Sequence, residues 1–316
     1  MTGAKVGRGA PFGAAMLAIA VALPFAGVSP YVVHVGVMTF VYVILVQSLN
    51  LVLGYCGLLS LATPAFFGIG AYASALLSLR LGWDALATFA VAIAAGAASG
   101  LAIAGPSLRV SRHSFVIVTL SATLLLQLVA NNWVDLTRGA LGLSGIPAPS
   151  FAGLRVTEKA DWYWFSLGLA IAAIGVAQAI VGSRTGRAMV ASRDNEQLAV
   201  AQGIDVLATR LFAFSVSGAL AGLAGAAYAH YLTFIDPGVF GFSLTESLLI
   251  MVILGGSGTL WGPVAGAIVF TVIPEVLRLA PELRSLLYGF VLLAVVLFLP
   301  RGFAAWFGRP AAGERR

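Results

Sequence analysis

The run Val32–Val52, VVHVGVMTFVYVILVQSLNLV, decides the fold class of this chain. It contains no Asp, Glu, Lys or Arg. A helix needs about 20 predominantly apolar residues to cross the hydrocarbon core of a bilayer. The run therefore predicts a membrane-spanning helix.

The composition of the whole chain extends this prediction. Of its 316 residues, 60% are hydrophobic and only 9% are charged, and the mean hydropathy is +0.98. A soluble domain carries roughly 25% charged residues. Because so few side chains are able to solvate a water-facing surface, lipid must be the outer solvent. We therefore expect an all-α integral membrane protein.

Apolar runs separated by breaks predict a polytopic bundle of about ten hydrophobic segments within a single transmembrane domain, residues 1–316. Several runs are short or rich in glycine, so the third and the eighth are expected to be broken or re-entrant. The segments lie near residues 11–28, 32–52, 62–79, 84–106, 114–130, 162–182, 208–230, 244–260, 263–280 and 285–300.

The first segment has two interpretations. Lys5 and Arg8 precede the apolar run 11–28, which is the pattern of a secretory signal peptide. An uncleaved first span is favoured, because a second apolar run follows almost immediately. A cleaved signal would also leave an odd number of spans.

Basic residues are concentrated in the connections that ten spans place on one side of the membrane. This asymmetry predicts that these connections, including the loop 183–209, are cytoplasmic, as are both termini. The loop 131–161 falls on the opposite, periplasmic side. The net charge of +6 is therefore a signal of orientation rather than of nucleic-acid binding. The basic clusters are Lys5/Arg8, Arg109/Arg112, Arg184/Arg187/Arg193/Arg210 and Arg301/Arg309/Arg315/Arg316.

The loop 183–209 is predicted to contain a short helix. Asp194 has the spacing of an N-cap residue relative to Gln197, and Gly203 is a natural C-terminal stop. A helix of about two turns is marginal alone in water. We expect it to dock on a cytoplasmic partner, and an ordinary solvated loop is the alternative.

The run Gly255–Gly258, GGSG, resembles a phosphate-binding loop only superficially. A Walker A loop ends in a lysine, and the only lysines are Lys5 and Lys159. We expect these glycines to break a helix where it lines a cavity, and a similar order of glycine, serine and proline occurs at 57–64. The candidate pathway residues are Gly57, Ser60, Thr63, Pro64, Phe66, Gly255, Gly256, Ser257 and Gly258.

Three pairs of glycines, each four residues apart, lie on three different segments. Small residues at this spacing let helix backbones approach closely. Together the pairs predict a tight helical bundle. They are Gly96/Gly100, Gly218/Gly222 and Gly262/Gly266.

Motifs for catalysis and metal binding are missing from the sequence. The single cysteine, Cys56, excludes an internal disulfide and a multi-cysteine metal site. The histidines His34, His113 and His230 are far apart and lack ligand spacing. The chain has no HExxH or GxSxG motif. We therefore expect no bound metal, and a membrane-embedded enzyme has little support.

Several ordered motifs, which together cover nearly the whole chain, resemble those of branched-chain amino-acid ABC transporter permeases of the LivH/LivM family. The most specific is LNLVLGYCGLLSL at 49–61, followed by AFFGIGAY at 65–72. The others are FVIVTL at 115–120, GLSGIP at 142–147, GRA at 186–188, RDNE at 193–196, AQGI at 201–204, AGLAG at 221–225, GGSGTLWGP at 255–263 and LPRG at 299–302.

The resemblance implies an inner-membrane permease subunit of an importer for branched-chain or other hydrophobic amino acids. Its implied partners are a second, LivH-like permease, two cytoplasmic ATPase subunits and a periplasmic binding protein. ATP and Mg²⁺ would be used by the ATPase, and this chain would bind no cofactor. The implied coupling helix, which enters a groove of the ATPase, contains Arg187, Arg193, Asp194, Glu196 and Gly203.

The chain departs from the family pattern at two places near the candidate pathway. Leu58 stands where members usually have glutamine, and Ala62-Thr63 stands where they have a Gly-His pair. These changes leave the cargo open, because the resemblance also includes permeases for urea, short amides and aromatic acids. A stand-alone secondary transporter or channel is the alternative from another class, but such proteins need ionisable relays, in which this sequence is poor.

Overall fold

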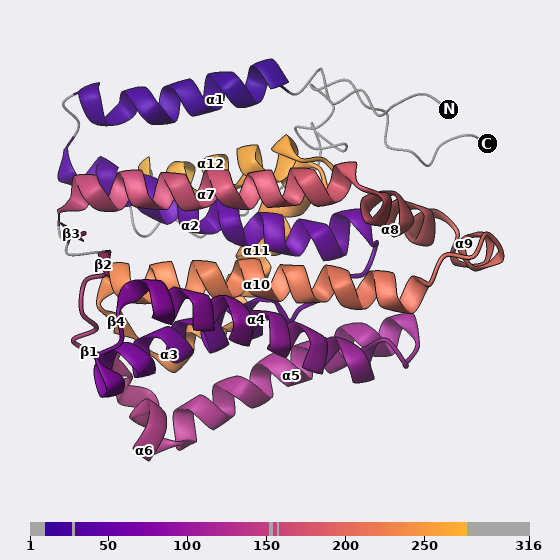
Figure 1. The fold of residues 1–316 in the computed structure, drawn as a ribbon, viewed down its shortest axis with the longest axis horizontal. Helices are drawn as coiled ribbons and strands as arrows, with labels where there is room; N and C mark the ends of the chain where they lie inside the picture. The colour runs from indigo at the N-terminus through magenta and orange to yellow at the C-terminus, as the bar shows by residue number, and fades with distance from the viewer. Residues whose placement is uncertain (1–9, 27–28, 152–153, 157, 277–316) are drawn as a thin grey trace.

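The computed structural model describes residues 10–26, 29–151, 154–156 and 158–276 (Figure 1). Its α-helices are α1 (Ala10–Ala22), α2 (Pro30–Asn50), α3 (Thr63–Leu81), α4 (Ala85–Ser107), α5 (Arg112–Asn132), α6 (Val134–Thr137), α7 (Lys159–Gly182), α8 (Arg184–Asp194), α9 (Glu196–Ala201), α10 (Val206–Leu232), α11 (Phe242–Gly255) and α12 (Trp261–Val276). Shorter helical turns are η2 (Leu23–Ala26), η3 (Leu51–Tyr55), η4 (Gly139–Leu141) and η5 (Pro237–Phe240).

Six of the described helices are long and apolar enough to cross a membrane. They confirm an all-α polytopic membrane protein, and three shorter apolar helices accompany them. The predicted segment 285–300, the end of segment 263–280 and both termini lie outside the described residues. The six spans are Pro30–Tyr55, Thr63–Leu81, Ala85–Ser107, His113–Asn132, Lys159–Gly182 and Val206–Leu232.

Helix α10 runs through the middle of the bundle (Figure 1). It packs against α4 and α3 on one side and against α2 on the other. Helix α2 in turn contacts α7 and α12, and α11 pairs with α12. The helices α8 and α9 lie at one end of the bundle, which we call the α8–α9 end; the short strands lie at the other, the strand end.

Glycines allow the closest helix crossings. A Cβ atom on Gly96 would overlap the carbonyl oxygen of Gly218, and one on Gly222 would overlap the carbonyl oxygen of Ala92. Gly100 meets the backbone of α10 in the same way, and in α12 Gly262 and Gly266 meet the backbone of α11. All three predicted glycine pairs therefore lie where two backbones touch.

Two breaks interrupt the helices, and one of them differs from the prediction. The segment near 62–79 was predicted to be broken, but α3 is continuous from Thr63. The break precedes it: α2 ends in the π-helical turn η3, and residues 57–62 form no regular structure. The segment near 244–260 is broken as predicted, because α11 ends at Gly255 and α12 begins at Trp261.

The loop 183–209 contains two helices rather than the single helix predicted. Ser183 caps α8, its hydroxyl accepting from the amide of Gly186, and α8 continues to Asp194. The predicted cap Asp194 is therefore wrong by one residue: the side chain of Asn195 caps α9. The end of α9 is as predicted, since Gly203 adopts a φ of 80° just beyond it.

The strand end is held together by two short antiparallel pairs. Strand β1 (Leu143–Ser144) pairs with β4 (Phe234–Ile235), and β2 (Ser150–Phe151) pairs with β3 (Leu154–Arg155). The side chain of His230, which is 1% exposed, also links the loop 131–161 to the helices. One ring nitrogen lies 2.8 Å from the carbonyl oxygen of Pro147 and the other 2.9 Å from the hydroxyl of Ser74. The loop 131–161 is thus fastened to α10 and α3.

Candidate functional site

The side chain of Arg193 lies where the two helix breaks meet. Its Nη1 atom donates a hydrogen bond of 2.7 Å to the carbonyl oxygen of Gly54 in η3. A Cβ atom on Gly57 would overlap the Cγ atom of Arg193, and one on Gly258 would lie 2.9 Å from Nη1. Both glycines also have a positive φ, 70° and 77°. Arg193 of α8 therefore touches the break after α2 and the break after α11 at once. We call this contact the junction.

Two polar side chains of α2 form hydrogen bonds with the break after α11 and so connect it to the junction. The side-chain oxygen of Asn50 accepts from the amide of Gly258 at 2.9 Å, and its nitrogen donates to the carbonyl of Thr259 at 2.8 Å. Gln47 donates to the carbonyl of Leu260 at 2.7 Å. A broken helix frees backbone groups that need partners inside a membrane. Asn50 and Gln47 supply those partners, so the break has a fixed position.

Cys56 sits inside the junction, immediately after the span that ends at Tyr55. The thiol is buried, with the residue 1% exposed. Burial raises the pKa of Cys56 to about 12, against the opposing positive charges of Arg210 and Arg193. The thiol is therefore protonated at neutral pH.

An ion pair positions α9 on the start of α10. Arg210 donates from both terminal nitrogens to the two carboxylate oxygens of Glu196, at 2.7 and 3.1 Å. Bidentate geometry of this kind fixes direction as well as distance. Arg193 also pairs with its neighbour Asp194 at 3.2 Å. Both of these predicted coupling residues, Arg193 and Glu196, therefore have charged partners within the chain. Arg187 is exposed and donates to the carbonyl oxygen of Gly182.

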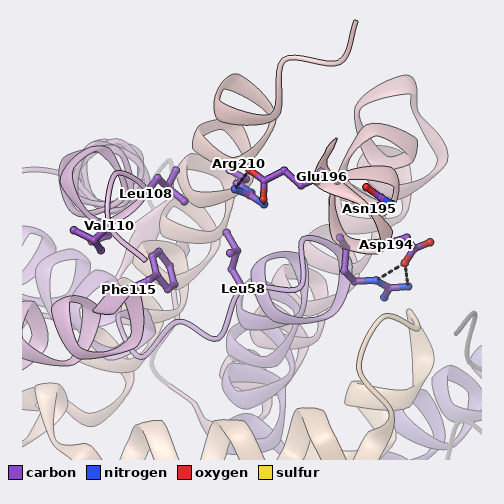
Figure 2. A pocket seen from close by; sticks show the side chains of 11 residues that line it. Leu58, Leu108, Val110, Phe115, Asp194, Asn195, Glu196 and Arg210 are labelled. Carbon is purple, nitrogen blue, oxygen red and sulfur yellow. Dashed lines mark hydrogen bonds and ion pairs between the residues drawn. The ribbon is translucent and has the colours of Figure 1, made fainter. Parts of the chain in front are cut away.

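A cavity of about 390 Å³ opens between this loop and the α4–α5 connection. Figure 2 shows Leu58 between Phe115 and the Glu196–Arg210 pair. Leu58, at one of the two places where the sequence departs from the pattern described above, therefore lies at the α8–α9 end. The lining of this cavity combines the apolar side chains of Leu108, Val110 and Phe115 with the charged groups of the loop.

The remaining candidate pathway residues lie in packed surroundings. Thr63, Pro64 and Phe66 are buried at the start of α3. Ser60 is 2% exposed, and its hydroxyl accepts from the amide of Ala62. Their role as pathway lining stays a prediction.

The second break contains both buried and exposed residues. Gly255 and Gly256 are buried, whereas Ser257 is exposed. A Cβ atom on Gly255 would overlap the carbonyl of Gly262. Close contact between the two helices therefore requires glycine at this end of α11.

Sequence reasoning missed Asn50 and Gly54 as members of the site. The signal for Asn50 is its amide in an otherwise apolar run. Gly54 contributes its carbonyl oxygen, which no residue pattern marks. Among the residues described here, no group of three or more His, Cys, Asp or Glu side chains is arranged to hold a metal ion.

Comparison with known proteins decides the family. Residues 31–296 match the family described as "Branched-chain amino acid transport system / permease component". The chain belongs to this permease family. It is thus a transport component of an ABC system, not an enzyme. No solved structure matches it.

Two curated members of the permease family are similar over most of their length. The high-affinity branched-chain amino acid permease LivM of Salmonella typhimurium is 32% identical over 91% of this chain and 73% of its own. LivM of Escherichia coli is 31% identical with the same coverage. The autoinducer 2 import permease LsrC of Salmonella paratyphi B is 30% identical over 67% of this chain and 61% of its own.

Proposed function

We propose that this permease passes branched-chain or other hydrophobic amino acids across the bacterial inner membrane, driven by ATP that separate subunits hydrolyse. ATP and Mg²⁺ bind those subunits rather than this chain. A second, LivH-like permease completes the pathway, and a periplasmic binding protein delivers the cargo. The family assignment and the similarity to LivM over 91% of the chain support this substrate class.

The charge distribution supports an orientation with α8 and α9 in the cytoplasm. The α8–α9 end carries Arg109, Arg184 and Arg187 as well as the two arginines of the site. The strand end carries charges of both signs, with the exposed Arg80 and Arg138 as well as the exposed Asp84 and Asp135. Cytoplasmic connections are rich in Lys and Arg. The loop 131–161 is accordingly periplasmic.

The observation that carries the proposal is the presence of two exposed apolar side chains on α9. Leu198 is 56% exposed and Val200 is 58% exposed, although both belong to a loop rich in charge. The neighbouring Asn195 and Gly203 fix both ends of the helix. A six-residue helix with exposed apolar side chains suits a groove on a partner. We assign this groove to the ATPase.

The junction supplies a route from the ATPase to the membrane segments. A force on α9 reaches α10 through the Glu196–Arg210 pair and reaches both breaks through Arg193. Helix breaks are places where a bundle is able to change shape without disrupting whole helices. In this proposal, closure of the ATPases moves α8 and α9 and thereby rocks the segments on either side of the breaks.

The test uses the complex purified with its ATPases. Replacing Leu198 and Val200 with serine is expected to reduce ATPase co-purification by at least tenfold. The control is Leu141→Ser, which also replaces an exposed leucine by serine, at a residue 84% exposed at the strand end. Full ATPase recovery with the Leu198/Val200 variant would contradict the docking assignment.

A second experiment distinguishes the residues that bind the ATPase from those that transmit its movement to the membrane segments. Replacing Arg193 and Glu196 each by a residue of opposite charge is expected to lower substrate-stimulated ATP hydrolysis and uptake. Because both side chains have partners inside the chain, the ATPases should remain bound. Wild-type uptake and ATP hydrolysis in this double variant would exclude the loop as the coupling element.

Cargo identity is tested by competition against labelled leucine uptake. Valine and isoleucine are expected to compete, whereas urea is not. Because the chain is also similar to LsrC, transport of an autoinducer-like cargo would contradict the amino-acid assignment.

A further inference from the structure

A second polar cavity, of about 380 Å³, begins at the strand end and extends between α2, α3, α10, η5 and α11. Its volume is in the range of small-molecule sites. Its apolar lining residues Val41, Leu45 and Leu244, which we call the apolar wall, belong to α2 and α11. Its polar lining residues belong to α2, α10, α11 and the start of η5, and they are Tyr42, Tyr228, Ser243, Ser247 and Asp236.

Asp236 is the unusual member of this cavity. Among the acidic side chains whose burial the structure describes, it alone is partly buried, and the others are exposed. One carboxylate oxygen accepts from the amide of Gly238 at 2.8 Å and caps η5. In the described residues, no Lys or Arg lines the cavity to balance the charge. A partly desolvated carboxylate is costly unless a cation accompanies it.

The backbone around Asp236 is held firmly. Its neighbour Ile235 is 1% exposed and pairs with Leu143 across the β1–β4 ladder. Pro237 and Val239 of η5 are buried on the other side. The carboxylate is therefore presented by a rigid segment rather than by a loose loop.

The aromatic wall is also fixed in place. Tyr228 packs edge-on against Phe67, with ring centroids 5.3 Å apart. Helix α10 thus contributes Tyr228 to a lining that also includes Ser243 and Ser247 of α11. Hydroxyl groups donate to a carboxylate, and a carboxylate accepts from an ammonium group. The apolar wall has room for a branched hydrocarbon side chain.

We propose that this cavity binds a zwitterionic amino acid with an apolar side chain, and that Asp236 holds its ammonium group. The hydroxyls of Tyr42, Tyr228 and Ser243 donate to the cargo carboxylate. The apolar residues Val41, Leu45 and Leu244 receive its side chain. This inference rests on the proposed amino-acid transport. It adds a specificity-determining residue on the side of the membrane where the cargo arrives.

The decisive variant is Asp236→Asn in the reconstituted complex with its ATPases and binding protein. Asparagine keeps an oxygen that is able to cap η5 and removes the charge, with an amide nitrogen in place of the second oxygen. The KM for leucine uptake is expected to rise at least tenfold, while the melting temperature, the basal ATP hydrolysis and the binding-protein affinity stay unchanged. The control is Glu246→Gln, which neutralises an exposed carboxylate on α11 outside the cavity lining.

A second measurement tests the ammonium group directly. In the wild-type complex, 4-methylpentanoate, which is leucine without its amino group, is expected to compete poorly. Leu244→Trp narrows the cavity at the apolar wall and keeps the Asp236 charge, and it is expected to impair leucine uptake more than alanine uptake.

The outcomes separate the two proposals. Leucine uptake by the wild type together with an unchanged KM in Asp236→Asn overturns the cavity assignment alone. Equal competition by 4-methylpentanoate also overturns it. A wild-type complex that hydrolyses ATP but takes up no amino acid overturns the proposed cargo, and the cavity assignment with it.

Discussion

Arg193 donates a hydrogen bond of 2.7 Å to the carbonyl oxygen of Gly54, which lies 139 residues earlier in the chain. The bond fastens the end of α8 to the π-helical turn that terminates α2. An arginine is suited to this position because its planar group reaches several acceptors at once. Two further donors of Arg193, Nε and Nη2, bond to a carboxylate oxygen of Asp194. The contact therefore sets where the α8–α9 loop sits relative to the membrane segments.

Gly57→Ala is expected to break this contact. The backbone there has a φ of 70°, which disfavours alanine, and the new Cβ atom would overlap the Arg193 side chain. We expect uncoupling of ATP hydrolysis from uptake and a loss of stability of about 1–3 kcal/mol. The measurements are uptake per ATP hydrolysed and the thermal unfolding midpoint.

The control isolates the steric part of the effect. Gly82→Ala imposes similar backbone strain, since φ is 62°, but nothing lies within 4 Å of its new Cβ atom. Gly82→Ala should lower stability without uncoupling. Equal uncoupling by both variants would mean that backbone strain, not the Arg193 contact, is responsible.

Cys56 offers a native probe of the junction, because it is the only cysteine in the chain. Its burial and raised pKa predict slow reaction with a soluble maleimide at pH 7. Arg193→Ala removes the side chain that covers Gly57 and is expected to accelerate labelling at least fivefold. The exposed Arg187, which also belongs to α8, supplies the control variant Arg187→Ala. Unchanged labelling in Arg193→Ala would show that the junction stays closed without the arginine.

Apolar runs predicted the spans well because the cost of placing polar groups in lipid depends on local composition. The breaks were also signalled locally, by Gly57 and by the run 255–258. The error of placing a break within 62–79 arose because glycines in α3 serve packing instead: a Cβ atom on Gly70 would overlap Gly222 of α10. Whether a glycine interrupts a helix or admits a neighbour depends on that neighbour.

The α8–α9 loop shows what local patterns do not decide. Aspartate and asparagine are comparable N-caps, so Asp194 and Asn195 were equally suited to start a helix. The outcome depended on Ser183, which starts α8 early enough for that helix to include Asp194. The contacts of Arg193 depend on segments far apart in the chain, and no local pattern specifies them.

Ser74→Ala is expected to destabilise the strand end. Its hydroxyl is the partner of one nitrogen of the buried His230, and the other nitrogen faces the Pro147 carbonyl. An unsatisfied buried polar group costs about 1–3 kcal/mol, so the thermal midpoint should fall. Ser99→Ala is the control, because that hydroxyl bonds only within its own helix, to the carbonyl of Gly96. A fall no greater than that of the control would show that His230 finds another partner.

Alanine in place of glycine should have opposite effects on α7 and α10. Within a helix, alanine is favoured over glycine by about 1 kcal/mol. At Gly168 of α7 nothing lies within 4 Å of the new Cβ atom, so Gly168→Ala is expected to raise the thermal midpoint slightly. At Gly218 the same atom would overlap the carbonyl oxygen of Gly96, which is backbone and has no rotamer to change. Gly218→Ala must therefore separate α10 from α4, and it should lower the midpoint despite the favourable helix propensity. If both substitutions stabilised the protein, helix propensity would outweigh packing at this crossing, and the close approach of α4 and α10 would not be a source of stability.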